Sequence, residues 1–211
     1  MFIKIGGVPA AGKTTISKIL VDCLRAAGYE AETVHGAKIL ADVLGVTVDE
    51  LRRLPKETRE AARPEMFRRI YEEDRNHPGR IWVRDAHFSL YEPTVGKFTI
   101  FPIQEGDKLQ MKAMIVLEAP AGIIKERRLS DGKQRQDRVL DPNIIRQEID
   151  RELAVAREQS LALSIPLITI GNYGRTPQEI CTDIVQRLKV EVFSDLEIMR
   201  GGISLERVRR L

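Results

Sequence analysis

The feature that most constrains this chain is an eight-residue segment close to its start. Residues 7–14 read Gly-Val-Pro-Ala-Ala-Gly-Lys-Thr, which matches the pattern GxxxxGK[ST] at every fixed position. An apolar run, Phe2 to Ile5, precedes the segment, and apolar residues at helical spacing follow it, namely Ile16, Ile19, Leu20 and Leu24. This order predicts a strand, a glycine-rich loop and a helix, with backbone N–H groups and a helix N-terminus gathered around a bound phosphate.

The loop predicts binding of ATP together with Mg²⁺. The residues expected to line the phosphates are Gly7, Pro9, Ala10, Ala11, Gly12, Lys13, Thr14 and Thr15. Lys13 would reach the β and γ phosphates as a catalytic residue, the Thr14 hydroxyl would ligate the metal, and Thr15 would contact the α phosphate. The alternative is a glycine-rich turn without a ligand, but that interpretation leaves the lysine unexplained.

A P-loop enzyme also needs a carboxylate at the end of a neighbouring strand to hold Mg²⁺. Asp85 follows the short, mostly apolar run Ile81 to Arg84, so we expect it to be this metal ligand and a catalytic residue. An aspartate in an ordinary strand-end turn is the alternative. His87 is assigned to the substrate site, where general acid–base and ligand-orienting roles stay open beside a simple hydrogen bond within its loop.

Short β-rich runs alternate with longer stretches of helical periodicity, which predicts an α/β fold with a parallel sheet and helices on both faces. The expected strands are Phe2 to Ile5, Glu32 to Val34, Ile81 to Arg84, Met111 to Leu117 and Leu167 to Ile170. The expected helices are Lys13 to Ala27, Ala37 to Leu54, Pro55 to Arg75, Ala121 to Leu129, Pro142 to Ala162 and Pro177 to Leu188. Pro55 and Pro64 favour several short helices over a long one, and Phe88 to Lys108 reads as a loop.

Length and composition indicate one domain, residues 1–188, in a chain of 211 residues that is 43% hydrophobic and 31% charged. A formal charge of +3 does not favour capture of nucleic acid or of an anionic membrane. Cys23 and Cys181 are far apart in sequence, so they suggest neither a disulfide nor a zinc site. With no leader pattern and no apolar run of about 20 residues, a cytoplasmic protein is expected. Residues 189–211 form a C-terminal extension of unknown role, with a possible strand at Val190 to Phe193.

Four sequence blocks occur in an order and spacing more specific than any one of them. They are GVPAAGKTT from Gly7, LRRLPKETRE from Leu51, Asp85-x-His87 with Ser89 close behind, and ERRLSDGKQRQDR from Glu126. Together they resemble the archaeal-type adenylate kinases within the nucleoside monophosphate kinase group, from Phe2 to about Leu188. The resemblance implies a P-loop kinase three-layer sandwich with a five-stranded parallel sheet and a short lid. It also implies transfer of the γ-phosphoryl group of ATP to AMP with Mg²⁺, in an enzyme that forms homo-oligomers.

Arginines are expected around the phosphates because phosphoryl transfer is catalysed mainly by positioning and by charge neutralisation. A short polar stretch around Gly132 carries four, Arg127, Arg128, Arg135 and Arg138, and predicts a small lid at about residues 127–141. We assign Arg127 to the nucleotide and Arg128 and Arg138 to catalysis, although Arg127 and Arg128 could exchange roles and a solvated helix end is the alternative. By the resemblance, Arg151 reaches the transferring phosphate; Arg146 and Arg157 are alternatives.

The acceptor region is expected at about residues 36–75. Gly36 follows the second strand, where glycine permits close approach of a ligand. The resemblance implies that Arg52 binds the phosphate of the acceptor. Arg53 is not separable from Arg52, and a surface salt-bridge helix explains both equally simply. As in related kinases, Asn172 with Gly171 is expected to line the adenine of ATP, unless the two form an ordinary turn. His35-Gly36-Ala37 does not reveal which base the acceptor carries.

Two further functions compete with a monophosphate kinase. One is a P-loop kinase that phosphorylates a different small molecule. The other is a regulator that binds and hydrolyses ATP on the same fold and acts on RNA or a protein partner. The sequence has no Asn-Lys-x-Asp block for reading guanine and no aromatic-rich basic stripe for stacking single-stranded nucleic acid, which weakens a GTPase or nucleic-acid function.

Overall fold

Five parallel strands form the centre of the protein in the computed structural model, which describes residues 1–131 and 139–194 except for the side chain of Arg52. The strands are β1 (Phe2–Gly6), β2 (Ala31–Val34), β3 (Ile81–Asp85), β6 (Met111–Glu118) and β7 (Leu167–Gly171). They are arranged in the order β2-β3-β1-β6-β7, and every neighbouring pair is parallel. All five predicted strands are confirmed. Because β1 lies in the middle, the loop that follows it emerges at the centre of the sheet's carboxyl edge.

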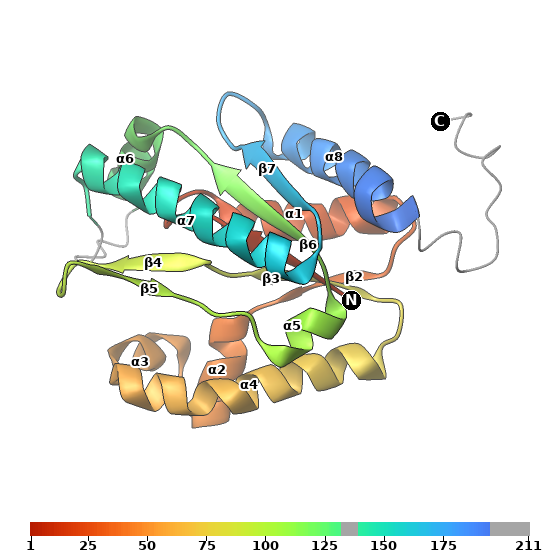
Figure 1. Cartoon of the computed structure of the whole chain (residues 1–211), viewed down its shortest axis with the longest axis horizontal. Helices are drawn as coiled ribbons and strands as arrows, with labels where there is room; N and C mark the ends of the chain where they lie inside the picture. Colours follow the sequence, from red (N-terminus) through yellow and green to blue (C-terminus); the bar gives the residue numbers. More distant parts are fainter. Residues whose placement is uncertain (132–138, 195–211) are drawn as a thin grey trace.

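Alternate residues of the strands pack into two separate hydrophobic cores, one on each face of the sheet. Ile3 and Ile5 of β1 face α1 (Lys13–Ala26) and α8 (Pro177–Leu188), with Cys181 in this core and Cys23 packed against it. Phe2 faces the other way, toward α7 (Pro142–Leu163) and toward the helices that precede β3. Helices therefore cover both faces, as predicted, and Figure 1 shows α1 and α7 on opposite sides of the sheet.

The region between β2 and β3 contains three helices, α2 (Gly36–Leu44), α3 (Val48–Arg53) and α4 (Lys56–Asn76). The single helix predicted from Ala37 to Leu54 is wrong, because Gly45 adopts a left-handed φ of 66° and ends α2. The expectation that Pro64 divides a helix is also wrong, since α4 runs through it. Pro64 is exposed, so water can satisfy the backbone carbonyl that loses its hydrogen-bond donor.

The segment Phe88 to Lys108 is not a plain loop. It forms an antiparallel hairpin, β4 (Ser89–Glu92) and β5 (Lys97–Ile100), and a short helix, α5 (Glu105–Gln110). Opposing Tyr91 and Phe98 stabilise the hairpin with ring centroids 5.2 Å apart, and Gly96 makes the turn at a φ of 65°. The hairpin extends between α7 on one side and α3 and α4 on the other (Figure 1).

The predicted strand at Val190 to Phe193 is also wrong. Residues Lys189–Phe193 form a π-helical turn that continues α8 and buries Phe193 against Tyr29, with ring centroids 4.6 Å apart. The helix α6 (Ala121–Ser130) reaches the start of the predicted lid. Residues 132–138 of that lid lie outside the described part of the chain, together with 195–211. Within the described ranges, no helix combines the length and apolar character needed to cross a membrane.

Candidate active site

The loop after β1 has the backbone of a phosphate-binding turn. Gly7 and Gly12 have φ values of 142° and 90°, and Ala10 adopts a φ of 72° that is strained for any residue with a side chain. A Cβ at Gly12 would lie 2.3 Å from Nδ2 of Asn172. At the start of α1, no side chain caps the helix and no acidic residue lies in its first turn. The first-turn N–H groups are therefore oriented to bind an anion.

Lys13 folds back over this loop. Its Nζ donates to the carbonyl oxygens of Gly7 at 2.8 Å and Val8 at 3.3 Å, and the residue is 9% exposed. The ammonium thus lies in the concavity of the loop, next to where phosphate oxygens would bind. Thr14 and Thr15, the next two residues, are exposed and accessible to a ligand.

Thr14 and Asp85 meet beside the loop, as expected for a magnesium site. Ile5 of β1 is in register with Asp85 of β3, and the Thr14 hydroxyl donates to Oδ2 of Asp85 over 2.7 Å. The described residues contain no cluster of three or more His, Cys, Asp or Glu side chains that could hold a metal alone. A hydroxyl and one carboxylate nevertheless fit Mg²⁺, because this ion is usually bound by one or two protein oxygens together with water and substrate phosphates.

Glu152 of α7 joins the loop to the segment after β3, and sequence reasoning missed it. Its Oε1 accepts from the backbone N–H of Gly7 at 2.9 Å and of Phe88 at 3.0 Å. Its Oε2 accepts from both the N–H and the hydroxyl of Ser89, at 2.6 and 3.0 Å. The side chain is 1% exposed. A glutamate on the inward face of α7, in step with Ile145 and Ala156, was the available signal.

His87 lies beside Glu152 and carries no positive charge at neutral pH. Burial lowers its pKa well below the usual value, and the cations Lys13 and Lys4 lower that pKa further. Its Nδ1 is buried, has no hydrogen-bond partner in the described structure, and lies 4.0 Å from Oε1 of Glu152. The ring can therefore contribute a neutral hydrogen-bonding group, but not an acidic proton at neutral pH.

The arginines at the end of α6 are already engaged with the loop and its surroundings. Arg128 is buried, pairs with Glu148 at 2.7 Å, and donates to the carbonyl of Pro9 from Nε at 3.3 Å and Nη2 at 3.2 Å. Arg127 donates to the carbonyl of Asn172 at 2.7 Å. Arg128 therefore fixes the loop and Arg127 fixes the segment after β7, whereas Arg135 and Arg138 fall outside the described residues.

Arg151 is half-buried on α7, as its position near a core boundary predicted. No hydrogen bond or ion pair engages it among the described side chains. It directly precedes Glu152, so its backbone is fixed beside the loop. The alternatives differ: Arg157 is exposed, and Arg146 lines a cavity near β7.

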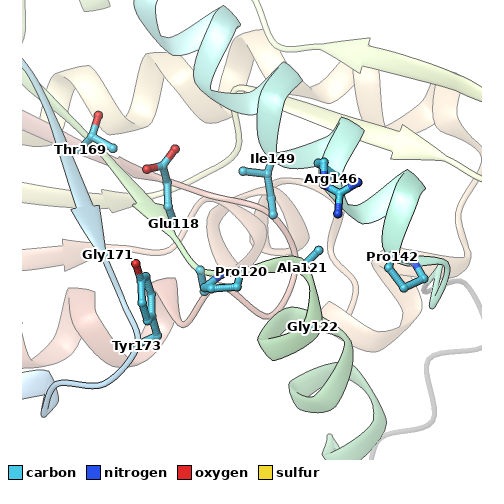
Figure 2. A pocket seen from close by; sticks show the side chains of 11 residues that line it. Glu118, Pro120, Ala121, Gly122, Pro142, Arg146, Ile149, Thr169, Gly171 and Tyr173 are labelled. Carbon is cyan, nitrogen blue, oxygen red and sulfur yellow. The ribbon is translucent and has the colours of Figure 1, made fainter.

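Asn172 is oriented by the loop. Its Nδ2 donates to the carbonyl of Ala11 at 2.7 Å, and its backbone N–H donates to the carbonyl of Glu118 at 2.7 Å. Gly171 instead lines an open cavity of about 660 Å³ between β6, β7, α6 and α7, which Figure 2 shows with Glu118, Arg146 and Tyr173 at its walls. Sequence reasoning did not anticipate this cavity.

The acceptor residues predicted from sequence lie on α2 and α3. Gly36 opens α2, and a Cβ there would meet Sδ of Met66 at 3.7 Å, an ordinary contact distance. The glycine is therefore not required by packing alone. Arg52 belongs to α3, but its side chain is outside the described structure, and neighbouring Arg53 is exposed.

Comparisons with known proteins agree with this geometry. The family described as "AAA domain" matches residues 6–146, a range that contains the loop, Asp85 and α6. A Thermococcus onnurineus protein named "Putative adenylate kinase" is 26% identical over 196 residues, covering 90% of this chain and 84% of that protein. A Thermococcus kodakarensis protein of the same name is 26% identical over 189 residues, with coverages of 90% and 86%.

Two solved structures share the fold at low identity. Shikimate kinase from Acinetobacter baumannii in complex with shikimate superposes with a TM-score of 0.53 and 17% identity, covering 90% of this chain and 93% of that one. The YorR protein from Bacillus subtilis in complex with phosphorylated GDP gives a TM-score of 0.51 and 17% identity, with coverages of 90% and 97%. The matched range, the sheet order and the phosphate-binding loop lead to one conclusion: this chain belongs to the AAA domain family and has a P-loop kinase fold.

Proposed function

We propose that this protein is a nucleoside monophosphate kinase that transfers the γ-phosphoryl group of ATP to AMP with Mg²⁺. The observation that carries the proposal is the contact between Thr14 and Asp85, 2.7 Å apart, beside a loop that already holds Lys13 in its concavity. The names of the Thermococcus relatives support the choice of AMP. A cytoplasmic location, where ATP and AMP are present, and a homo-oligomeric state accompany this proposal as predictions.

The loop and Lys13 bind the triphosphate in the proposed reaction. Backbone N–H groups at the start of α1, from Lys13 to Thr15, would face the phosphates, and Lys13 would exchange its bonds to the loop carbonyls for bonds to the β and γ phosphates. Thr14 and Asp85 would hold Mg²⁺, which neutralises charge on the phosphates when bound. Arg127 and Asn172 would position the nucleotide. Arg128, through Pro9, keeps the loop in place, and Arg138 and Arg151 are proposed to neutralise the transferring group.

Transfer forms a bond between an acceptor phosphate oxygen and the γ phosphorus while the bond to the β-phosphate oxygen breaks, which releases ADP. A phosphate acceptor is already ionised near neutral pH, so no residue has to remove a proton from it. This agrees with the uncharged state of His87, for which we propose a hydrogen bond to the substrate. Gly36 and Arg52 stay proposals for the acceptor site.

The second candidate is a kinase whose acceptor is an alcohol, and the fold shared with a shikimate-bound kinase is the reason to keep it. An alcohol must lose its proton during transfer, so Asp85 would have to serve as a base as well as a metal ligand. A monophosphate acceptor would lose rate at about pH 6, where its own phosphate becomes protonated, whereas an alcohol acceptor has no group that titrates there.

The proposal is tested by a coupled assay for ADP formation from ATP and Mg²⁺ with AMP, CMP, UMP, GMP or dTMP as acceptor. We expect AMP to give the highest kcat/KM, and the Lys13→Met variant to serve as the inactive control. Activity with none of the five acceptors would contradict a monophosphate kinase. ATP hydrolysis that rises only when RNA or a protein partner is added would identify the regulator instead.

A further inference from the structure

Two arginines on α4 have no role in the site described so far. Arg59 and Arg63 lie four residues apart, which places them one above the other on the same face of the helix. Both are half-buried. Neither was singled out by the sequence, because α4 is rich in charged residues all around and its pattern does not identify the face that turns inward.

Neither guanidinium forms a close ion pair among the described residues, although the charge of Glu92 acts on Arg59 and that of Glu60 acts on Arg63. The guanidinium of Arg63 lies over the ring of Phe101, 5.2 Å from its centroid, and Nε of Arg59 is buried without a hydrogen-bond partner. Within residues 1–131 and 139–194, no carboxylate side chain lies in ion-pair distance of either guanidinium. Burial and the charge of Arg59 lower the pKa of Arg63, and only the charge of Glu60 raises it.

The other arginines of the same helix are arranged differently. Arg68 bonds Glu65 at 2.7 Å and also Glu72, Arg69 bonds Glu65 at 2.9 Å, and Arg75 lies 4.0 Å from Glu72. All three are on the exposed surface of the protein. The helix therefore pairs the arginines that face water and leaves unpaired the two that are partly withdrawn from it. Such burial is unfavourable unless an anion compensates it.

A chain of contacts that begins with Arg63 on Phe101 links this part of α4 to the phosphate-binding loop through the base of the hairpin. The Phe101 N–H donates to the carbonyl of Phe88 at 3.0 Å, and the Phe88 N–H donates to Glu152, the carboxylate that also holds Gly7. Lys56, at the start of α4, bonds Glu92 of the hairpin at 3.1 Å. In Figure 1, the hairpin lies between α4 below and α7 above.

We infer that Arg59 and Arg63 bind the phosphate group of the acceptor. The inference rests on the proposed monophosphate kinase function and identifies its substrate class as a phosphate dianion presented from the α4 side. Two adjacent guanidinium groups supply the bidentate, charge-assisted donors that a phosphate requires, and the cation–π contact with Phe101 restricts the movement of the Arg63 guanidinium. An uncharged alcohol would leave both arginines without a partner.

The test uses the full-length Arg59→Gln, Arg63→Gln and Arg63→Lys variants, with Arg69→Gln as the control from the exposed face of the same helix. AMP and ATP binding are each measured by titration calorimetry, with AMP as the acceptor probe. We expect Arg59→Gln and Arg63→Gln to weaken AMP binding by about 10- to 100-fold and to leave ATP binding within about twofold. Arg63→Lys should weaken AMP binding by an intermediate factor, because it keeps the charge and loses the planar fork.

Unfolding temperatures separate this function from a structural role. Because Arg63 is desolvated and unpaired, Arg63→Gln should leave the melting temperature unchanged or raise it, whereas AMP should stabilise the variant less than the wild type. Wild-type AMP affinity in both glutamine variants would overturn the inference, as would an equal loss in Arg69→Gln. Calorimetry measures binding without turnover. If the wild type binds AMP but has no kinase activity, and the glutamine variants lose that binding, the kinase proposal is refuted and the anion site is supported.

Discussion

Replacing Glu152 with glutamine tests how the phosphate-binding loop is held in its shape. The carboxylate accepts four hydrogen bonds, from the N–H groups of Gly7, Phe88 and Ser89 and from the Ser89 hydroxyl. Glutamine has nearly the same size but replaces one accepting oxygen by an NH₂ group. Whichever way the amide turns, at least one buried N–H then faces another donor instead of an acceptor.

The expected loss of stability follows from these contacts. Hydrogen bonds to a charged group contribute roughly 1.5–3 kcal/mol each, and the Ser89 hydroxyl can rotate to accept from the new NH₂. The Glu152→Gln variant should therefore lose about 2–4 kcal/mol of unfolding free energy. For a domain of this length, that loss corresponds to a decrease in Tm of about 5–15 °C.

Urea unfolding followed by circular dichroism measures the change, with Glu158→Gln as the control because Glu158 is exposed on the same helix. ATP affinity should fall in the Glu152 variant as well, since the loop loses the bond that anchors Gly7. An unfolding free energy within about 0.5 kcal/mol of the wild type, with unchanged ATP affinity, would refute the role assigned to Glu152.

Three other substitutions have defined outcomes. Lys13→Met should lower kcat for phosphoryl transfer by at least about 100-fold with little change in Tm, and retention of activity would exclude Lys13 from the phosphate site. Gly12→Ala should destabilise the loop and reduce ATP binding in calorimetry, because the new Cβ would lie 2.3 Å from Nδ2 of Asn172; a fully stable, ATP-binding variant would contradict the geometry. Burial lowers the pKa of Lys4 to about 7. Between about pH 7 and 10, Lys4 is therefore protonated in the unfolded chain but not in the folded protein, so the stability of the fold rises with pH. Lys4→Met should therefore exceed the wild type in urea unfolding near pH 6 and lose part of that advantage near pH 9, whereas a pH-independent difference would contradict the shifted pKa.

The sheet and most helices were predictable because their signals are local. The strands are short apolar runs, of which β1, β3 and β6 are largely buried on both faces. Thr176 with Pro177 caps α8, as the sequence indicated. The hairpin was missed because its strands have four residues each and their turn, Pro93 to Gly96, dominates the pattern. Val190 to Phe193 has a strand-like composition, but α8 continues into it and buries Phe193 instead.

The candidate site also contains residues that the sequence could predict and residues that it could not. Lys13, Thr14 and Asp85 could be predicted because a loop pattern and a strand end are read within a few residues. Glu152 could not, since its partners lie 63 to 145 residues away in sequence and only the packing of α7 brings them together. Likewise, the number of arginines on α4 says little until the structure separates the paired, exposed ones from Arg59 and Arg63.

The central claim is that the protein transfers a phosphoryl group from ATP to AMP. The most direct test is to follow a radioactive label on that group. Purified protein is mixed with ATP that carries radioactive phosphorus in the γ position, together with AMP and Mg²⁺, and the products are separated after a single turnover. The claim predicts that the label appears in the β-phosphate of ADP and that Lys13→Met abolishes its appearance. Label found only in inorganic phosphate, or left in ATP, would contradict the claim.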